Sequence, residues 1–200
     1  DMEKIIRKSG IDIIGDIPWG SRMGLLYQTP DELLYILIPY FQAGLNNNEV
    51  CLWVTSELFD KQSAEKALAK SIVDFKKYVK KGQIEVIPHT EWFIRDNALD
   101  MRKAFKNWND KLNRTIAKGF EGLRGAYNIN WLEKKDWQPF IKFGTADEDI
   151  INKELSICAY SLDKCEVPEI IDMVNNHQSV LFKRNGKWDF LEKHKRSDAH

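Results

Sequence analysis

The stretch MGLLYQTPDELLYILIPYFQAGLNNNEVCLWVTSE, from Met23 to Glu57, decides the expected fold. An apolar run over Met23–Tyr27 meets a polar break at Gln28–Pro30, and apolar residues then recur at helical spacing over Leu33–Leu45. A second apolar run, Val50–Val54, follows. A helix between two apolar strands predicts a right-handed parallel β-α-β unit, with the two strands adjacent or one strand apart. The ligand site of such a sheet is expected at the carboxyl ends of its strands.

The rest of the chain continues the alternation of strands and helices. Further strands are expected at Gln83–Pro88, Leu123–Ile129, Leu155–Tyr160 and Val180–Lys183, with an antiparallel return over Lys187–Leu191. Further helices are expected at Asp60–Lys70, Ile72–Lys81, Met101–Ile116, Pro139–Asn152 and Pro168–Asn176. Residues 1–14 predict a short charged helix, and Thr90–Asp96 predicts a loop. Asn185-Gly186 predicts a tight hairpin turn.

Together these elements predict one three-layer α/β/α domain over residues 1–200. Its sheet is expected to be mostly parallel, with about six strands and a C-terminal antiparallel hairpin. The N-terminal helix, within residues 1–16, and the charged tail, residues 192–200, are expected to be peripheral.

Charge balance and cysteine spacing exclude several functional classes. Thirty basic residues balance thirty acidic ones, so we expect no direct nucleic-acid binding. The three cysteines, Cys51, Cys158 and Cys165, show no paired spacing, which argues against a disulfide framework and a zinc site. No apolar run approaches the roughly 20 residues that span a bilayer. A cytoplasmic domain without a metal or another cofactor is expected.

The opening unit resembles the RecA/KaiC-type ATPases, in which a strand, a phosphate loop, a helix and a second strand ending in acidic residues follow one another. In that family the loop is rich in glycine and carries a lysine. Here the same place reads Tyr27–Glu32, without either, and Asp31 and Glu32 would repel a triphosphate. We therefore expect no ATP hydrolysis.

A closer resemblance covers Ile17–Phe190. Its pieces are Pro18-Trp19-Gly20, Leu26-Tyr27, Tyr40–Glu57, Lys118–Arg124, Asn130–Leu132, Glu148–Asn152, Cys158–Tyr160 and His177. Together they are similar to the MEDS domain, a sensory domain of methanogens and methylotrophs named partly for the dichloromethane regulator DcmR. The family commonly has a histidine near the start of the first strand, where this chain has Ser21-Arg22-Met23.

The resemblance implies a KaiC-like fold that has lost its ATPase apparatus and senses a ligand. Such domains are often joined to a histidine kinase or a DNA-binding domain, in cis or in trans. The pattern is compatible with a homodimer. The expected ligand is small and mostly apolar, or related to one-carbon metabolism.

Residues at or near the expected strand ends form the predicted ligand site. Arg124 lies in an apolar strand, so it needs a carboxylate such as Glu57, carbonyl groups or an anionic ligand. His89 is either a structural residue or a ligand contact. The aromatic residues either pack between sheet and loops or wall an apolar pocket. The candidate residues are Trp19, Arg22, Tyr27, Glu57, His89, Trp92, Arg124, Trp131 and Tyr160.

Three functions compete for this pattern. The leading hypothesis is a non-enzymatic sensory module with no catalytic residues of its own. The second is an enzyme of unknown class that uses Glu57, His89 and Arg124. The third is a protein-binding scaffold derived from an ATPase fold.

Overall fold

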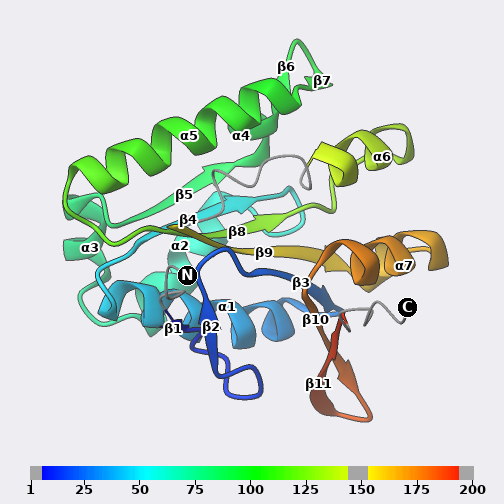
Figure 1. Cartoon of the computed structure of the whole chain (residues 1–200), viewed down its shortest axis with the longest axis horizontal. Helices are drawn as coiled ribbons and strands as arrows, with labels where there is room; N and C mark the ends of the chain where they lie inside the picture. The colour runs from blue at the N-terminus through cyan, green and yellow to red at the C-terminus, as the bar shows by residue number, and fades with distance from the viewer. Residues whose placement is uncertain (1–5, 144–152, 194–200) are drawn as a thin grey trace, which may run out of the picture.

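The computed structural model describes residues 6–143 and 153–193 (Figure 1). Its main sheet has seven strands in the order β11-β10-β3-β9-β8-β4-β5, and only β10 and β11 pair in antiparallel fashion. These strands are β3 (Arg22–Tyr27), β4 (Val50–Thr55), β5 (Ile84–Pro88), β8 (Leu123–Asn128), β9 (Glu154–Ser161), β10 (Ser179–Arg184) and β11 (Lys187–Glu192). The helices are α1 (Pro30–Asn46), α2 (Lys61–Ser71), α3 (Phe75–Lys81), α4 (His89–Phe93), α5 (Met101–Ala117), α6 (Lys134–Phe143) and α7 (Val167–Asn176).

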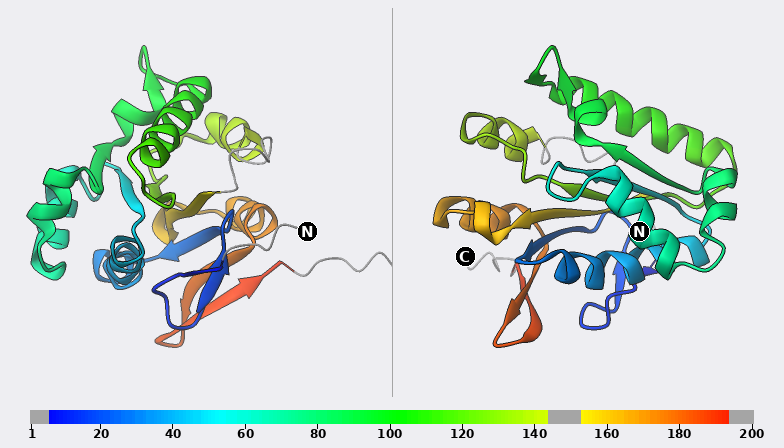
Figure 2. Two further views of the ribbon diagram at one scale, coloured as in Figure 1. Left: turned by 60° about the vertical axis from the view of Figure 1, so that its left-hand side comes forward. Right: turned by 180° about the vertical axis from the view of Figure 1, so that it is seen from behind.

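Helices cover both faces of this sheet, which gives the predicted three layers (Figures 1 and 2). On one face α1, α2 and α3 enclose a core that includes Phe41 and Trp53. On the other face α4, α5, α6 and α7 enclose a second core that includes Phe93 and Met173. The predicted class, a mostly parallel α/β sheet with a C-terminal hairpin, is confirmed.

The predicted position of the first two strands is wrong. β8 and β9 lie between β3 and β4, so the strand at Met23 is neither adjacent to the strand at Val50 nor one strand away. The crossover through α1 is long enough to span two intervening strands. The sequence of Met23–Glu57 alone does not indicate that later strands insert between β3 and β4.

The predicted N-terminal helix is also wrong in the described residues. Residues 6–8 form β1 (Ile6–Lys8), which pairs in antiparallel fashion with β2 (Asp16–Pro18). Gly10 has φ +80° and lies against α1, where a Cβ atom would come within 2.2 Å of the carbonyl oxygen of Pro39. Glycine is required at this turn because of both the backbone angle and the close contact.

The predicted loop at Thr90–Asp96 contains regular structure. Its first half belongs to α4, and a small hairpin follows, with β6 (Ile94–Arg95) paired to β7 (Ala98–Leu99). Asp96 and Asn97 form its turn at φ 51° and 60°, angles that these two residue types tolerate well.

The C-terminal hairpin is as predicted, with Asn185 at φ 51° and Gly186 at φ 74° between β10 and β11. The predicted helix Pro139–Asn152 begins earlier, at Lys134, and its part beyond residue 143 lies outside the described residues. Most of the predicted tail, from residue 194, lies outside them too. None of the helices in ranges 6–143 and 153–193 has the length and apolar character needed to cross a membrane.

Candidate functional site

The structure distributes the nine predicted site residues over both edges of the sheet. Those at or beyond the carboxyl ends of strands are Tyr27, Glu57, His89, Trp92, Trp131 and Tyr160. Those at or before the amino ends are Trp19, Arg22 and Arg124. A strand of ordinary length separates its two ends by about 17–20 Å. The nine residues therefore do not surround one cavity.

Arg124 is a structural residue at the amino edge. Its side chain is fully buried, and its Nε donates to Glu49 Oε2 at 2.5 Å. Its remaining N–H groups donate to Glu49 Oε1 and to three backbone carbonyl oxygens at 2.8 to 3.2 Å. The expected pairing with Glu57 is wrong, because Glu57 follows the opposite end of β4. All five N–H donors of Arg124 are used within the protein. Arg124 is therefore not available for the role that the enzyme hypothesis gives it.

Side chains occupy the turn where relatives with a phosphate loop would bind phosphate. Thr29 Oγ1 accepts a hydrogen bond from Glu32 N at 3.2 Å and caps α1. Glu32 Oε2 in turn accepts one from Gln28 N at 2.8 Å. A phosphate at this turn would have to displace the Glu32 carboxylate from Gln28 N and the Thr29 hydroxyl from Glu32 N.

The two tyrosines of the predicted pocket are engaged in packing. Tyr27 Oη accepts a hydrogen bond from Asn130 Nδ2 at 2.6 Å. The ring of Tyr160 stacks on Trp137 with 5.3 Å between centroids, and its hydroxyl donates to the carbonyl oxygen of Lys164. These contacts favour packing over ligand binding for both.

A shallow hollow of about 230 Å³ lies beyond the carboxyl ends of β4 and β5. Its lining includes Glu57 and His89, and the His89 ring stacks on Trp131 at 4.9 Å between centroids. Burial lowers the pKa of His89, although the nearby Glu57 acts in the opposite direction. The hollow thus brings together two of the predicted residues, Glu57 and His89, and a third, Trp131, stacks on His89.

A second polar group lies on the face that α5, α6 and α7 cover. We call it the β9 cluster, and its members are Arg22, Tyr127, Glu154, Cys158 and His177. The register of β3, β9 and β8 explains four of them, because Arg22 lies opposite Ser156 and Cys158 lies opposite Tyr127. Alternate residues of a strand share a face, so these side chains project to the same side.

The fifth member, His177, reaches the cluster from the end of α7. Its neighbour Gln178 fixes that position, because Gln178 N donates to Arg22 O at 3.0 Å and Gln178 Oε1 accepts from Arg22 N at 2.7 Å. The second residue after α7 is therefore tied to the first residue of β3.

Tyr127 joins the cluster to α5. Its hydroxyl donates to Glu154 Oε1 at 3.0 Å and accepts from Trp108 Nε1 at 2.5 Å. The ring leans back along β8 over Gly125, where a Cβ atom would lie 2.3 Å from the Tyr127 hydroxyl oxygen. Glycine is therefore needed for the Tyr127–Glu154 contact.

Burial determines the protonation states in the cluster. It raises the pKa of Glu154 to about 7, although Tyr127 and Arg22 act to lower it. It raises the pKa of the Cys158 thiol to about 11 and lowers the pKa of His177 to about 4. At neutral pH the thiol is protonated, the imidazole is neutral, and the carboxyl group is poised between two states.

Two members of the cluster have unused binding capacity. His177 Nδ1 lies 2.9 Å from the carbonyl oxygen of Met173 and must donate to it, which leaves Nε2 as an acceptor. Nε2 is buried and has no partner among the residues that the structure describes. Within the same residues, no carboxylate lies at ion-pair distance from the Arg22 guanidinium, although Glu154 is near enough for its pKa to respond to it.

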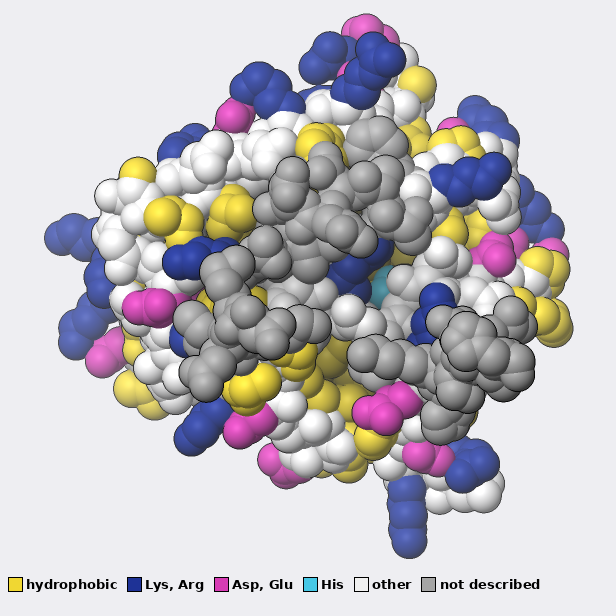
Figure 3. All heavy atoms as spheres, viewed as in Figure 1, with side chains coloured by type: hydrophobic (Ala, Val, Ile, Leu, Met, Phe, Trp, Pro, Cys, Tyr) yellow, Lys and Arg dark blue, Asp and Glu magenta, His cyan; other side chains and the backbone are white. Residues whose placement is uncertain are grey.

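The polar face of β9 is partly accessible to solvent. Glu154, Ser156 and Cys158 stay partly accessible, although β9 has hydrogen-bonded strands on both sides. On the face seen in Figure 3, a histidine lies beside basic side chains in a depression near the centre. Such a polar recess with perturbed pKa values is typical of a binding site.

Comparison with known proteins agrees with this fold. A family model described as MEDS, the MEthanogen/methylotroph, DcmR Sensory domain, matches residues 23–178. The chain belongs to the MEDS family. None of the curated proteins compared with this MEDS chain matches it.

Two solved structures resemble the MEDS chain across nearly its whole length. The KaiC-like protein PH0186 from Pyrococcus horikoshii shares 18% identity with a TM-score of 0.61, and the match covers 97% of this chain and 90% of that one. The flagellar accessory protein FlaH from Methanocaldococcus jannaschii shares 15% identity with a TM-score of 0.55, over 96% and 87%. These similarities show a KaiC-like fold, as predicted.

Sequence reasoning placed only Arg22 of the β9 cluster among the site residues of this MEDS domain. The signal for two others, Glu154 and Cys158, was that these residues and Ser156 alternate with apolar residues, which indicates a strand with one polar face. The predicted site lies at the carboxyl edge of the sheet, whereas the β9 cluster lies on one of its faces.

Proposed function

We propose that this MEDS domain is a non-enzymatic sensor that binds a small molecule at the β9 cluster. One observation carries the proposal: the unpartnered Nε2 of buried His177 lies near the Arg22 guanidinium, above a partly accessible central strand. Buried polar atoms in proteins nearly always have a partner. A bound ligand would supply one to both residues.

The hydrogen-bond donors and acceptors of the cluster indicate what kind of ligand it would bind. Arg22 offers N–H donors and positive charge, and His177 Nε2 offers an acceptor. An alcohol fits both, because its oxygen can accept from Arg22 while its O–H group donates to His177. An ionised carboxylate would pair with Arg22 alone. Apolar side chains, including Met173 and Val180, pack beside β3 at Gly24. We infer a short-chain oxygenated molecule with a small apolar body, one-carbon compounds included.

The recipient of the signal is proposed to be a histidine kinase or a DNA-binding domain, in cis or in trans. The family's description as a sensory domain supports this role. Three free cysteines support a reducing compartment, the cytoplasm.

A sensor of this kind is expected not to hydrolyse ATP, because Thr29 and Glu32 occupy the N–H groups that would hold phosphate. Phosphate release should stay at the background rate in Mg-ATP. Turnover that Glu57→Gln abolishes would contradict the non-enzymatic assignment.

Arg22→Gln is expected to weaken binding of a small oxygenated probe by about tenfold or more, since a charged hydrogen-bond partner contributes about 1.5–3 kcal/mol. Saturation-transfer NMR with methanol, formate and acetate would measure binding to the intact protein. The matched control is Arg95→Gln, because Arg95 is an exposed residue paired with Asp100. Equal binding by the two variants, or no binding of any probe by the unmodified protein, would reject the proposed site.

A further inference from the structure

The hollow beyond the carboxyl ends of β4 and β5 contains a buried polar atom without a partner. Ser56 lines this hollow and is only 3% exposed. Within the residues that the structure describes, its hydroxyl oxygen has no hydrogen-bond partner. A buried hydroxyl without a partner is rare in proteins and costs free energy. A molecule bound in the hollow would supply the missing contact.

His89 offers the hollow a second polar atom. Its buried ring stacks on Trp131 and forms a hydrogen bond with the backbone of Thr55. Trp131 is itself fixed, because its Nε1 donates to the carbonyl oxygen of Asn128 at 2.8 Å. Burial, the largest cause, lowers the pKa of His89, so the ring is neutral at pH 7. The bond with Thr55 acts to raise the pKa, so His89 is its donor and the other ring nitrogen is an acceptor.

Glu57 supplies a negative charge at the same place. It lines the hollow and lies close enough to His89 to affect the pKa of the ring. Its side chain is exposed and forms no ion pair in the part of the chain that the structure describes. The turn that carries it is held by a bridge between Ser56 and Phe59 and by the stack of Phe59 on Trp53. The carboxylate is therefore available to a ligand and lies on a turn that the fold fixes.

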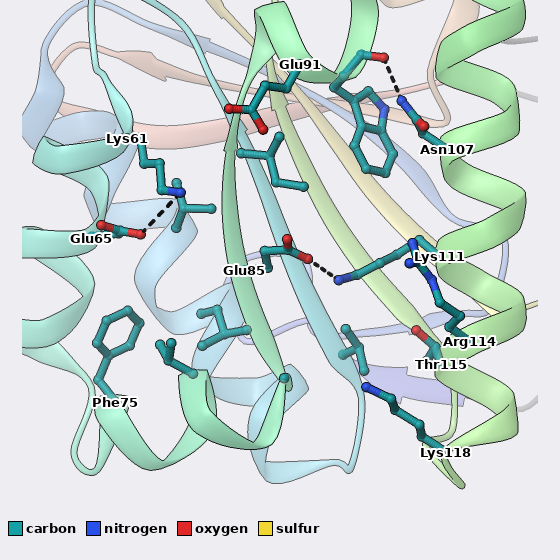
Figure 4. Close-up of a pocket in the computed structure, with 17 residues that line it drawn as sticks. Lys61, Glu65, Phe75, Glu85, Glu91, Asn107, Lys111, Arg114, Thr115 and Lys118 are labelled. Carbon is teal, nitrogen blue, oxygen red and sulfur yellow. Dashed lines mark hydrogen bonds and ion pairs between the residues drawn. The ribbon is translucent and has the colours of Figure 1, made fainter.

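The other two charged residues of the lining already have partners. Asp60 Oδ1 accepts a hydrogen bond from Ser63 N at 2.8 Å and caps α2. Lys61 points to Glu65 (Figure 4), with 3.9 Å between Lys61 Nζ and Glu65 Oε1. The lining carries two carboxylates and one ammonium group, so its charge favours a cation.

We propose that this hollow binds a small primary amine in its ammonium form. An ammonium group has three N–H donors and one positive charge. The hollow offers an unpaired negative charge and three acceptors, which are the Glu57 carboxylate, the second ring nitrogen of His89 and the Ser56 hydroxyl oxygen. With a volume of about 230 Å³ the hollow is smaller than the sites that hold drug-sized molecules, so the amine has only a few heavy atoms.

Two other classes of ligand fit this hollow less well. An anion would be attracted by Lys61 but would also meet the carboxylates of Glu57 and Asp60. A metal ion usually needs three or more ligands, and no group of three His, Cys, Asp or Glu side chains is placed to hold one among the described residues. The hollow lies at the carboxyl edge of the sheet, so this proposal is independent of the β9 cluster.

The test titrates methylammonium into the labelled protein at neutral pH and follows ¹H–¹⁵N and ¹H–¹³C NMR signals. The signals of Ser56, Glu57 and His89 are expected to shift together, with one common affinity. Tetramethylammonium is the matched probe, because it keeps the positive charge but has no N–H donor. It is expected to bind about tenfold more weakly or worse. Equal affinity of the two cations, or shifts of these signals with acetate but not with methylammonium, would overturn the proposal.

Glu57→Gln is expected to weaken methylammonium binding by about tenfold or more, and Ser56→Ala by about fivefold, because a hydrogen bond to a charged group contributes more than one to a hydroxyl. The matched control is Glu91→Gln. Glu91 is an exposed carboxylate that lines a separate groove along β5 (Figure 4) and not this hollow. Its replacement is expected to leave the affinity unchanged. The proposal is wrong if Glu57→Gln binds as tightly as Glu91→Gln, if Ser56→Ala binds as tightly as the unmodified protein, or if methylammonium shifts the signals of the β9 cluster instead.

Discussion

Replacing Arg124 with methionine is expected to lower the free energy of unfolding by about 3–5 kcal/mol, the usual cost of removing one partner of a buried ion pair. Glu49 would stay fully buried, with Arg7 as its remaining ion-pair partner at 2.8 Å. Three backbone carbonyl oxygens would lose their donor as well. Methionine replaces the apolar stem of arginine without the guanidinium group, so most of the effect should come from lost polar contacts. Urea unfolding followed by circular dichroism would measure it.

Arg95→Met is the control for this change, because the Arg95–Asp100 pair is exposed and should contribute no more than about 1 kcal/mol. An Arg124→Met protein as stable as the Arg95→Met protein would show that Arg124 is not needed for folding. The ligand-binding interpretation of Arg124 would then return.

Glu154→Gln is expected to stabilise the protein at pH 8 by about 2–3 kcal/mol, since a shift from 4.5 to about 7 corresponds to roughly 1.4 kcal/mol per pKa unit before solvent screening. Burial disfavours the carboxylate, so above pH 7 the folded protein holds an unfavourable charge that glutamine lacks. Glutamine keeps an oxygen that can accept from the Tyr127 hydroxyl.

The pH dependence follows from the same shift. Between pH 4.5 and about 7 the folded state binds more protons at Glu154 than the unfolded state does, so the contribution of Glu154 to stability falls as pH rises through this window. His177, whose pKa is lowered to about 4, contributes a rise over much of the same window, so the test is the difference between two proteins. The stability advantage of Glu154→Gln over the unmodified protein, measured by unfolding, should grow from pH 4.5 to pH 8, whereas Glu121→Gln, an exposed change, should follow the unmodified protein. Parallel profiles for all three proteins would show that Glu154 is not the group responsible.

The predictable part of the fold was that encoded by local rules. Asn185-Gly186 gave the hairpin because both residues accept positive φ, and Thr29-Pro30 marked the start of α1 through a cap and a fixed backbone angle. The order of the strands is not determined by local sequence. β8 and β9 insert between β3 and β4, and β8 begins more than sixty residues after β4 ends. The turn at Gly10 depends in the same way on contact with Pro39.

The site was harder to predict than the fold. Arg124 correctly indicated a buried ion pair, but its partner Glu49 precedes β4, while the sequence reasoning considered Glu57 beyond its far end. His177 joins the β9 cluster only because Gln178 ties the end of α7 to β3. Neither contact produces a recognisable spacing of residues in the sequence, because each joins segments that are far apart along the chain.

The most direct test of the account is where a small oxygenated probe binds. Methanol titrated into uniformly labelled protein and followed by ¹H–¹⁵N and ¹H–¹³C NMR should shift the signals of Gly24, Tyr127, Cys158 and His177 together, with one common affinity. The signals of Glu57 and His89, at the carboxyl edge of the sheet, should stay in place. Shifts confined to Glu57 and His89 would contradict the central claim that this MEDS domain senses its ligand over β9.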